Sequence, residues 1–84
     1  MTIQFTEEAW KDFEWILDND KQLAKRIRIL LKDMLRNPTD GLGKPEKLRF
    51  DLSGCWSRRI NDEHRLVYKI EKDAIIIISC RYHY

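Results

Sequence analysis

The chain has 84 residues, of which 43% are hydrophobic, and its 16 lysines and arginines against 14 acids give a formal net charge of +2. This length has room for one small domain over residues 1–84 and excludes a second. No apolar stretch approaches the ~20 residues of a transmembrane helix, and no signal peptide is visible. We therefore expect a cytoplasmic protein that does not bind a membrane.

The first half of the chain predicts an edge strand followed by two helices. Residues 2–5 alternate, and Thr6 is a typical helix N-cap with acids in the first turn after it. Apolar residues then recur at helical spacing over 9–17 and again over 23–35, with Asp18-Asn19-Asp20 between them and Asn37-Pro38 at the end. We expect a helical hairpin whose aromatic and leucine stripes form core; a ligand site there is the weaker alternative.

After a loop at 39–45, the hydrophobic period changes from helical to two. The alternation of Leu48, Phe50 and Leu52 predicts a long strand that begins at Glu46. Three more strands are expected around 56–60, 66–70 and 75–78, separated by turns at 61–64 and 71–73. The sequence thus predicts an α+β fold of order β-α-α-β-β-β-β, with the two-helix hairpin packed on one face of a mostly antiparallel, twisted sheet.

Charge is unevenly distributed along this chain. Residues 1–20 hold six acids and one lysine, whereas residues 21–37 hold six bases and one acid. In the sheet, Arg49, Arg59, Arg65 and Lys69 fall on the face that the helices leave uncovered. Arginine side chains from neighbouring strands suit phosphate oxygens. The alternative is an ordinary solvated face with salt bridges.

Two cysteines, Cys55 and Cys80, have no metal-ligand spacing, and we expect no metal and no cofactor. Reduced thiols are the favoured state, and a disulfide between them is the alternative.

Glu46 and His83 could supply acid–base chemistry beside the arginines. RNA is cleaved without a metal when a base removes the ribose 2′-OH proton, an acid protonates the leaving 5′-oxygen, and cations stabilise the phosphate. Glu46 begins one predicted strand, and His83 follows the last. An isolated glutamate at a strand end is also a common surface residue, so both interpretations stay open at this point.

Several motifs together resemble the YoeB/Txe branch of the RelE toxin superfamily from end to end. They are Gly41-Leu42-Gly43-Lys44-Pro45-Glu46, Leu52-Ser53-Gly54, Trp56-Ser57-Arg58-Arg59-Ile60, Glu63-His64-Arg65-Leu66-Val67-Tyr68 and Cys80-Arg81-Tyr82-His83-Tyr84. The resemblance implies a bacterial toxin of a type II toxin–antitoxin pair with a microbial-ribonuclease-like RelE fold. It implies an endoribonuclease that cleaves mRNA in the ribosomal A site and inhibits translation.

The resemblance also implies roles for single residues. Glu46 matches the general base, His83 the general acid, Arg65 the residue that stabilises the transition state, and Tyr84 a terminal residue that shapes the site. Arg59 matches a second phosphate-facing arginine. Arg49 stands where a lysine is commoner, Lys47 replaces a proline, and Phe50 stands where histidine is frequent.

The partners implied are a YefM/Axe-like antitoxin, the ribosome with its mRNA, and a second copy in a homodimer, with operator DNA bound only through the antitoxin complex. Two other functions remain alternatives. One is a gyrase poison, because the superfamily contains such members without this acid–base set. The other is a passive nucleic-acid-binding module that uses only the arginine face.

Overall fold

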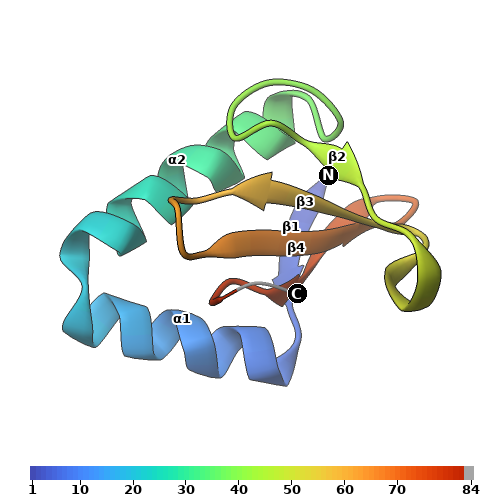
Figure 1. Ribbon diagram of the computed structural model, residues 1–84. Helices are drawn as coiled ribbons and strands as arrows, with labels where there is room; N and C mark the ends of the chain where they lie inside the picture. Colours follow the sequence, from blue (N-terminus) through green and yellow to red (C-terminus); the bar gives the residue numbers. More distant parts are fainter. Residues whose placement is uncertain (83–84) are drawn as a thin grey trace.

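The computed structural model describes residues 1–82 and has the predicted order of elements (Figure 1). They are β1 (Thr2–Phe5), α1 (Glu7–Asn19), α2 (Lys21–Arg36), β2 (Glu46–Lys47), a 3₁₀ turn (Phe50–Leu52), β3 (Cys55–Arg59), β4 (Arg65–Ile70) and β5 (Ala74–Ser79). The sheet order is β1-β5-β4-β3-β2, with β1 parallel to β5 and the other pairs antiparallel. The predicted fold class is confirmed.

The two helices begin and end where their capping residues predict. The Thr6 side chain accepts a hydrogen bond from the backbone amide of Ala9 (3.2 Å), and Asp20 accepts one from that of Leu23 (3.0 Å). Asp20 is thus both the C-cap of α1 and the N-cap of α2. Because one residue does both, the connection between the two helices is tight. Within residues 1–82, no helix has the length and apolar composition to span a bilayer.

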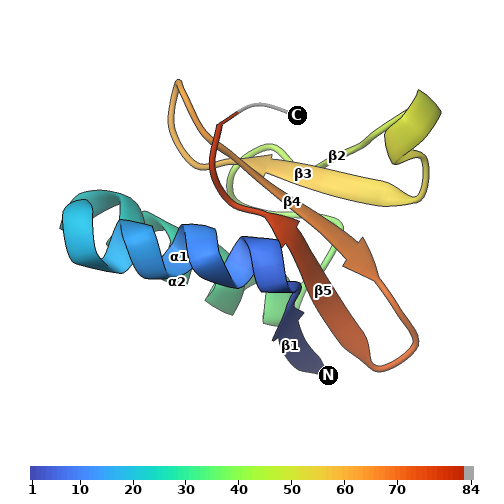
Figure 2. The same cartoon turned by 90° about the horizontal axis from the view of Figure 1, so that it is seen from below.

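The core lies between the hairpin and one face of the sheet (Figures 1 and 2). Its fully buried members include Ile16 from α1, Ile27 and Leu30 from α2, and Leu66 and Ile77 from the central strands. Part of the predicted apolar stripe is not core, because Trp10, Leu17 and Leu35 remain 43–46% exposed. Trp10 instead packs edge-on against Phe5, with ring centroids 5.6 Å apart.

The predicted long strand from Glu46 to Leu52 is wrong. β2 has only two residues, paired as Glu46 with Ser57 and Lys47 with Trp56, and the chain then forms the 3₁₀ turn. Phe50 has a φ of 58°, a left-handed conformation that no strand residue adopts. The alternation of apolar residues was therefore not a strand signature here: Leu48 is buried, whereas Phe50 is 91% exposed.

Candidate functional site

A small hollow on the sheet gathers three of the six site residues that the sequence predicts. It has a volume of about 110 Å³ and is lined by Lys44, Glu46, Ser57, Arg59 and Arg65. The strand register explains this grouping. Glu46 lies opposite Ser57, Arg59 follows two residues later on the same face of β3, and Arg65 lies opposite Arg59 on β4. Glu46, Arg59 and Arg65 therefore lie on one face of the sheet and line the same hollow.

The cations of this face differ in what they contact. Within residues 1–82 no ion pair joins Arg49, Arg59 or Arg65 to a carboxylate, so the salt-bridged alternative does not describe these three. Arg65 instead donates from Nη1 to the carbonyl oxygens of Asn61 (3.1 Å) and His64 (3.3 Å). Lys69 does form an ion pair, with Glu71 at 3.3 Å.

Arg49 does not belong to the hollow that holds Arg59 and Arg65. Because the strand from Glu46 is short, Arg49 lies in the segment after β2, so the three arginines come from two strands and a loop. It lines a second, larger hollow of about 540 Å³ together with Glu46, Lys47, Leu48, Phe50 and Leu52. Glu46 lines both hollows, which are therefore adjacent.

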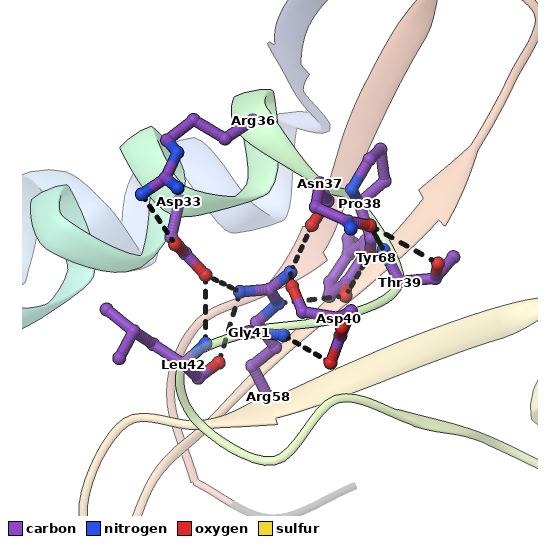
Figure 3. A network of polar contacts seen from close by, with 10 residues as sticks. All are labelled: Asp33, Arg36, Asn37, Pro38, Thr39, Asp40, Gly41, Leu42, Arg58 and Tyr68. Atoms are coloured by element: carbon purple, nitrogen blue, oxygen red, sulfur yellow. Dashed lines mark hydrogen bonds and ion pairs between the residues drawn. The ribbon is translucent and has the colours of Figure 1, made fainter.

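Arg58 organises the loop that leads to Glu46, and it had no predicted role (Figure 3). Its side chain is fully buried, and each of its five N–H groups has an acceptor. The acceptors are a carboxylate oxygen of Asp33 (2.7 Å), the hydroxyl of Tyr68 (3.1 Å) and the carbonyl oxygens of Asn37 (2.6 Å), Asp40 (2.9 Å) and Leu42 (3.1 Å). One guanidinium thus joins α2, β3, β4 and the 37–42 loop.

The partners of Arg58 are held in turn. Asp33 also accepts a hydrogen bond from the Leu42 amide (2.9 Å), and this bond, followed by that from Arg58, lowers the pKa of the Asp33 carboxyl. Tyr68 donates to the carbonyl of Pro38 (2.8 Å), and its burial raises the pKa of the phenol. At Gly41, where φ is 116°, an added Cβ would overlap the Asp33 carboxylate.

The loop is also attached directly to the site. The backbone amide of Arg59 donates to the carbonyl of Gly43 at 2.6 Å, three residues before Glu46. The loop is therefore fixed at α2, at the buried guanidinium and at β3, and its last part enters β2 with Glu46 opposite Ser57. The contacts of this loop therefore fix the position at which the chain enters β2.

The segment after β5 runs to the turn between β3 and β4 (Figure 2). There the Tyr82 amide donates to Nδ1 of His64 (2.6 Å), and the Arg65 amide donates to the Tyr82 carbonyl (3.0 Å). The Arg81 guanidinium lies 3.7 Å from the ring centre of Trp15 on α1. Tyr82 is thereby attached to the first residue of β4, Arg65, which lines the small hollow.

Two predicted site residues, His83 and Tyr84, lie outside the described residues. Sequence reasoning missed three supporting residues: Arg58, His64 and Tyr82. Arg58 carried a usable signal, because a charged residue between Trp56 and Ile60 in the period-two pattern falls on the core face and needs buried partners. The 1–82 region contains no group of three His, Cys, Asp or Glu side chains placed to hold a metal ion.

Comparison with known proteins agrees with the resemblance in the motifs. Residues 5–84 match the family model of the YoeB-like toxin of bacterial type II toxin-antitoxin systems. A toxin YoeB from Synechocystis sp. is 58% identical over the whole chain and 98% of its own length. A YoeB/ParE toxin from Agrobacterium tumefaciens superposes over the full length of both chains with a TM-score of 0.97 and 40% identity.

The YoeB of Staphylococcus aureus is similar as well, in two assemblies. Its dimer has a TM-score of 0.92 and 48% identity, covering 100% of this chain and 98% of that one. Its YoeB–YefM complex has a TM-score of 0.91 and 48% identity, covering 98% and 95%. With the family model matched from residue 5 to residue 84, the chain belongs to the YoeB-like toxins of bacterial type II toxin–antitoxin systems.

Proposed function

We propose that this toxin is a ribosome-dependent endoribonuclease that cleaves mRNA in the ribosomal A site without a metal ion. The observation that carries the proposal is the small hollow in which Glu46 lies with Arg59 and Arg65. A carboxylate beside two guanidinium groups provides a proton acceptor next to a site for a phosphate, which are the two groups that attack by a 2′-hydroxyl requires.

In this mechanism Glu46 takes the proton of the ribose 2′-OH, and the 2′-oxygen forms a bond to phosphorus. Arg59 and Arg65 stabilise the negative charge on the phosphate oxygens as the transition state forms. The bond from phosphorus to the 5′-oxygen breaks, and that oxygen takes a proton from His83. The products are a 2′,3′-cyclic phosphate and a 5′-hydroxyl. The roles of His83 and Tyr84 come from the family resemblance.

The test is primer extension on mRNA from ribosomes incubated with the purified toxin, which is either untreated or treated with EDTA and dialysed before it meets the ribosomes. The pretreatment spares the Mg²⁺ that ribosomes need, and discrete cuts at the A-site codon are expected from both toxin samples. Glu46→Gln and His83→Ala should each lower the cleavage rate by about 10²–10⁴-fold. DNA breaks in place of mRNA cuts would support a gyrase poison, and binding without cuts would support a passive module.

We also propose that the chain pairs with itself and with a YefM-like antitoxin, as the Staphylococcus aureus YoeB does in its dimer and in its YoeB–YefM complex. Arginines without carboxylate partners in the described part of the chain favour an acidic antitoxin segment over the site. Co-expression with the neighbouring gene product should restore growth and abolish the mRNA cuts, and unchanged toxicity would contradict this pairing.

A further inference from the structure

Phe50 is more exposed than any other large hydrophobic residue in the described chain. Its side chain is 91% exposed, whereas the next, Met1, is 57% exposed and the others are lower. An isolated exposed apolar residue is ordinary. An aromatic ring that is almost entirely exposed beside a candidate active site is unusual. The backbone conformation of Phe50 is a second reason to examine this residue.

The backbone at Phe50 is strained in a way that burial does not offset. Its φ of 58° brings Cβ close to the following carbonyl, a conformation that bulky residues rarely adopt. The turn around it is nevertheless ordered: the Leu52 amide donates to the Arg49 carbonyl (3.2 Å) and the Ser53 amide to the Phe50 carbonyl (3.0 Å). Strain of this kind is concentrated at functional sites.

The hollow beside the ring is lined by both charged and apolar side chains. Its sequence neighbours Arg49 and Asp51 are both exposed, and Lys47 lies across the same 540 Å³ hollow. The other apolar side chains that line this hollow are Leu48, which is buried, and Leu52, which is partly buried. One strongly exposed ring between exposed charged side chains is a narrower apolar surface than the core of a protein interface.

We propose that Phe50 is a stacking platform for a nucleobase of the bound RNA, adjacent to the linkage held at Glu46. This rests on the proposed function, since Glu46 lines both the hollow beside Phe50 and the hollow with Arg59 and Arg65. A flat exposed ring stacks on the face of any base, and Arg49 beside it supplies a cation for the adjoining phosphate. The strained turn keeps the ring extended before RNA arrives.

The test measures binding without cleavage. Ribosomes carry an mRNA whose A-site codon has 2′-deoxyribose and one 2-aminopurine, and the fluorescence of that base reports stacking. Loss of an aromatic platform costs about 5- to 150-fold in affinity. Phe50→Ala and Phe50→Leu should weaken binding within that range and abolish the quenching, whereas Phe50→Tyr and Phe50→Trp should retain most of both. Leu17→Ala, an exposed apolar residue on α1, is the matched control and should bind as wild type does.

A stability measurement separates this role from a structural one. Phe50→Gly removes the strain of the positive φ, so its midpoint of denaturation should rise while its RNA affinity falls. If Phe50→Leu binds and quenches as wild type does, or if Phe50→Ala weakens only dimerisation or antitoxin binding, stacking is contradicted. If the wild type binds and quenches the 2′-deoxy codon but does not cleave an all-ribose codon, the proposed function is overturned and the stacking proposal is not. Absence of binding by the wild type would overturn both.

Discussion

Nδ1 of His64 accepts a hydrogen bond of 2.6 Å from the backbone amide of Tyr82, the residue that precedes the proposed general acid. Nε2 of the same imidazole lies 3.7 Å from a carboxylate oxygen of Glu63. Because Nδ1 accepts a hydrogen bond and Nε2 faces a carboxylate, the neutral ring carries its proton on Nε2. The ring is only 8% exposed. His64 therefore holds Tyr82 beside the turn between β3 and β4.

Replacing His64 with leucine should reduce cleavage more than it reduces folding. The variant loses the acceptor for the Tyr82 amide, and a misplacement of about 1 Å can cost on the order of 10²-fold in rate. His64→Asn is the matched control, because its side-chain oxygen can replace Nδ1 and should restore much of the rate. Single-turnover cleavage at saturating ribosomes measures this. Equal rates for the leucine variant and the wild type would show that the Tyr82 contact has no part in catalysis.

Arg58 and Arg59 are adjacent in β3, but substitutions at the two positions should have different effects. Substitution of Arg58 should lower stability, and substitution of Arg59 should lower the cleavage rate. Arg58→Met removes the buried cation that pairs with Asp33 and the donor to three loop carbonyls, so the free energy of unfolding should fall by about 3–5 kcal/mol. Arg59→Met changes an exposed side chain, so unfolding should change by less than about 0.5 kcal/mol while cleavage falls. Urea denaturation and primer extension on both variants test this. A stable Arg58→Met protein would refute the structural role of the network.

The network also predicts how stability depends on pH. The folded-state pKa of Asp33 is lowered by the Leu42 amide and Arg58, so the folded state binds its proton less readily than the unfolded chain does. The stabilisation is therefore complete above the unfolded pKa of about 3.9 and is lost as pH falls through the lower folded value. Compared with Asp33→Asn in urea at pH 6 and near pH 3, the wild type should have a smaller advantage in the free energy of unfolding at the lower pH. A constant difference would mean that Asp33 does not titrate as described.

The two cysteines should react at very different rates. Both are free in the structure, Cys55 partly buried and Cys80 buried. Burial and, to a lesser degree, Asp12 raise the pKa of the Cys80 thiol to about 12, and its Sγ lies 3.6 Å from the Ala9 carbonyl. Iodoacetamide at pH 8 should therefore modify Cys55 in the folded protein and Cys80 only after denaturation. Mass spectrometry of the labelled peptides would contradict this if Cys80 reacted first.

Local sequence signals predicted the helices and the later strands well, because their causes lie within a few residues. Thr6 and Asp20 act on amides three residues away. The strand expected from Glu46 to Leu52 failed because a two-residue alternation cannot reveal the left-handed backbone at Phe50, which reverses the chain. An edge strand with a partner on one side has little pairing to oppose that turn.

The grouping of Glu46, Arg59 and Arg65 could be predicted, because strand pairing places them together. The residues that hold this group in place could not be predicted. Arg58 contacts Asp33, which is 25 residues away, and Tyr82 contacts His64, which is 18 residues away. Such contacts depend on the packing of α2 and on the path of the chain after β5. No spacing rule in the sequence carries that information.

In the proposed mechanism, Glu46 accepts a proton from a ribose 2′-hydroxyl whose phosphate is held by Arg59 and Arg65. The most direct measurement is primer extension on ribosomes carrying mRNA with one 2′-deoxyribose at the nucleotide 5′ to the cut. The mechanism predicts that cleavage at this linkage disappears while the unmodified mRNA is cut normally. Cleavage of the 2′-deoxy linkage at an undiminished rate would contradict it.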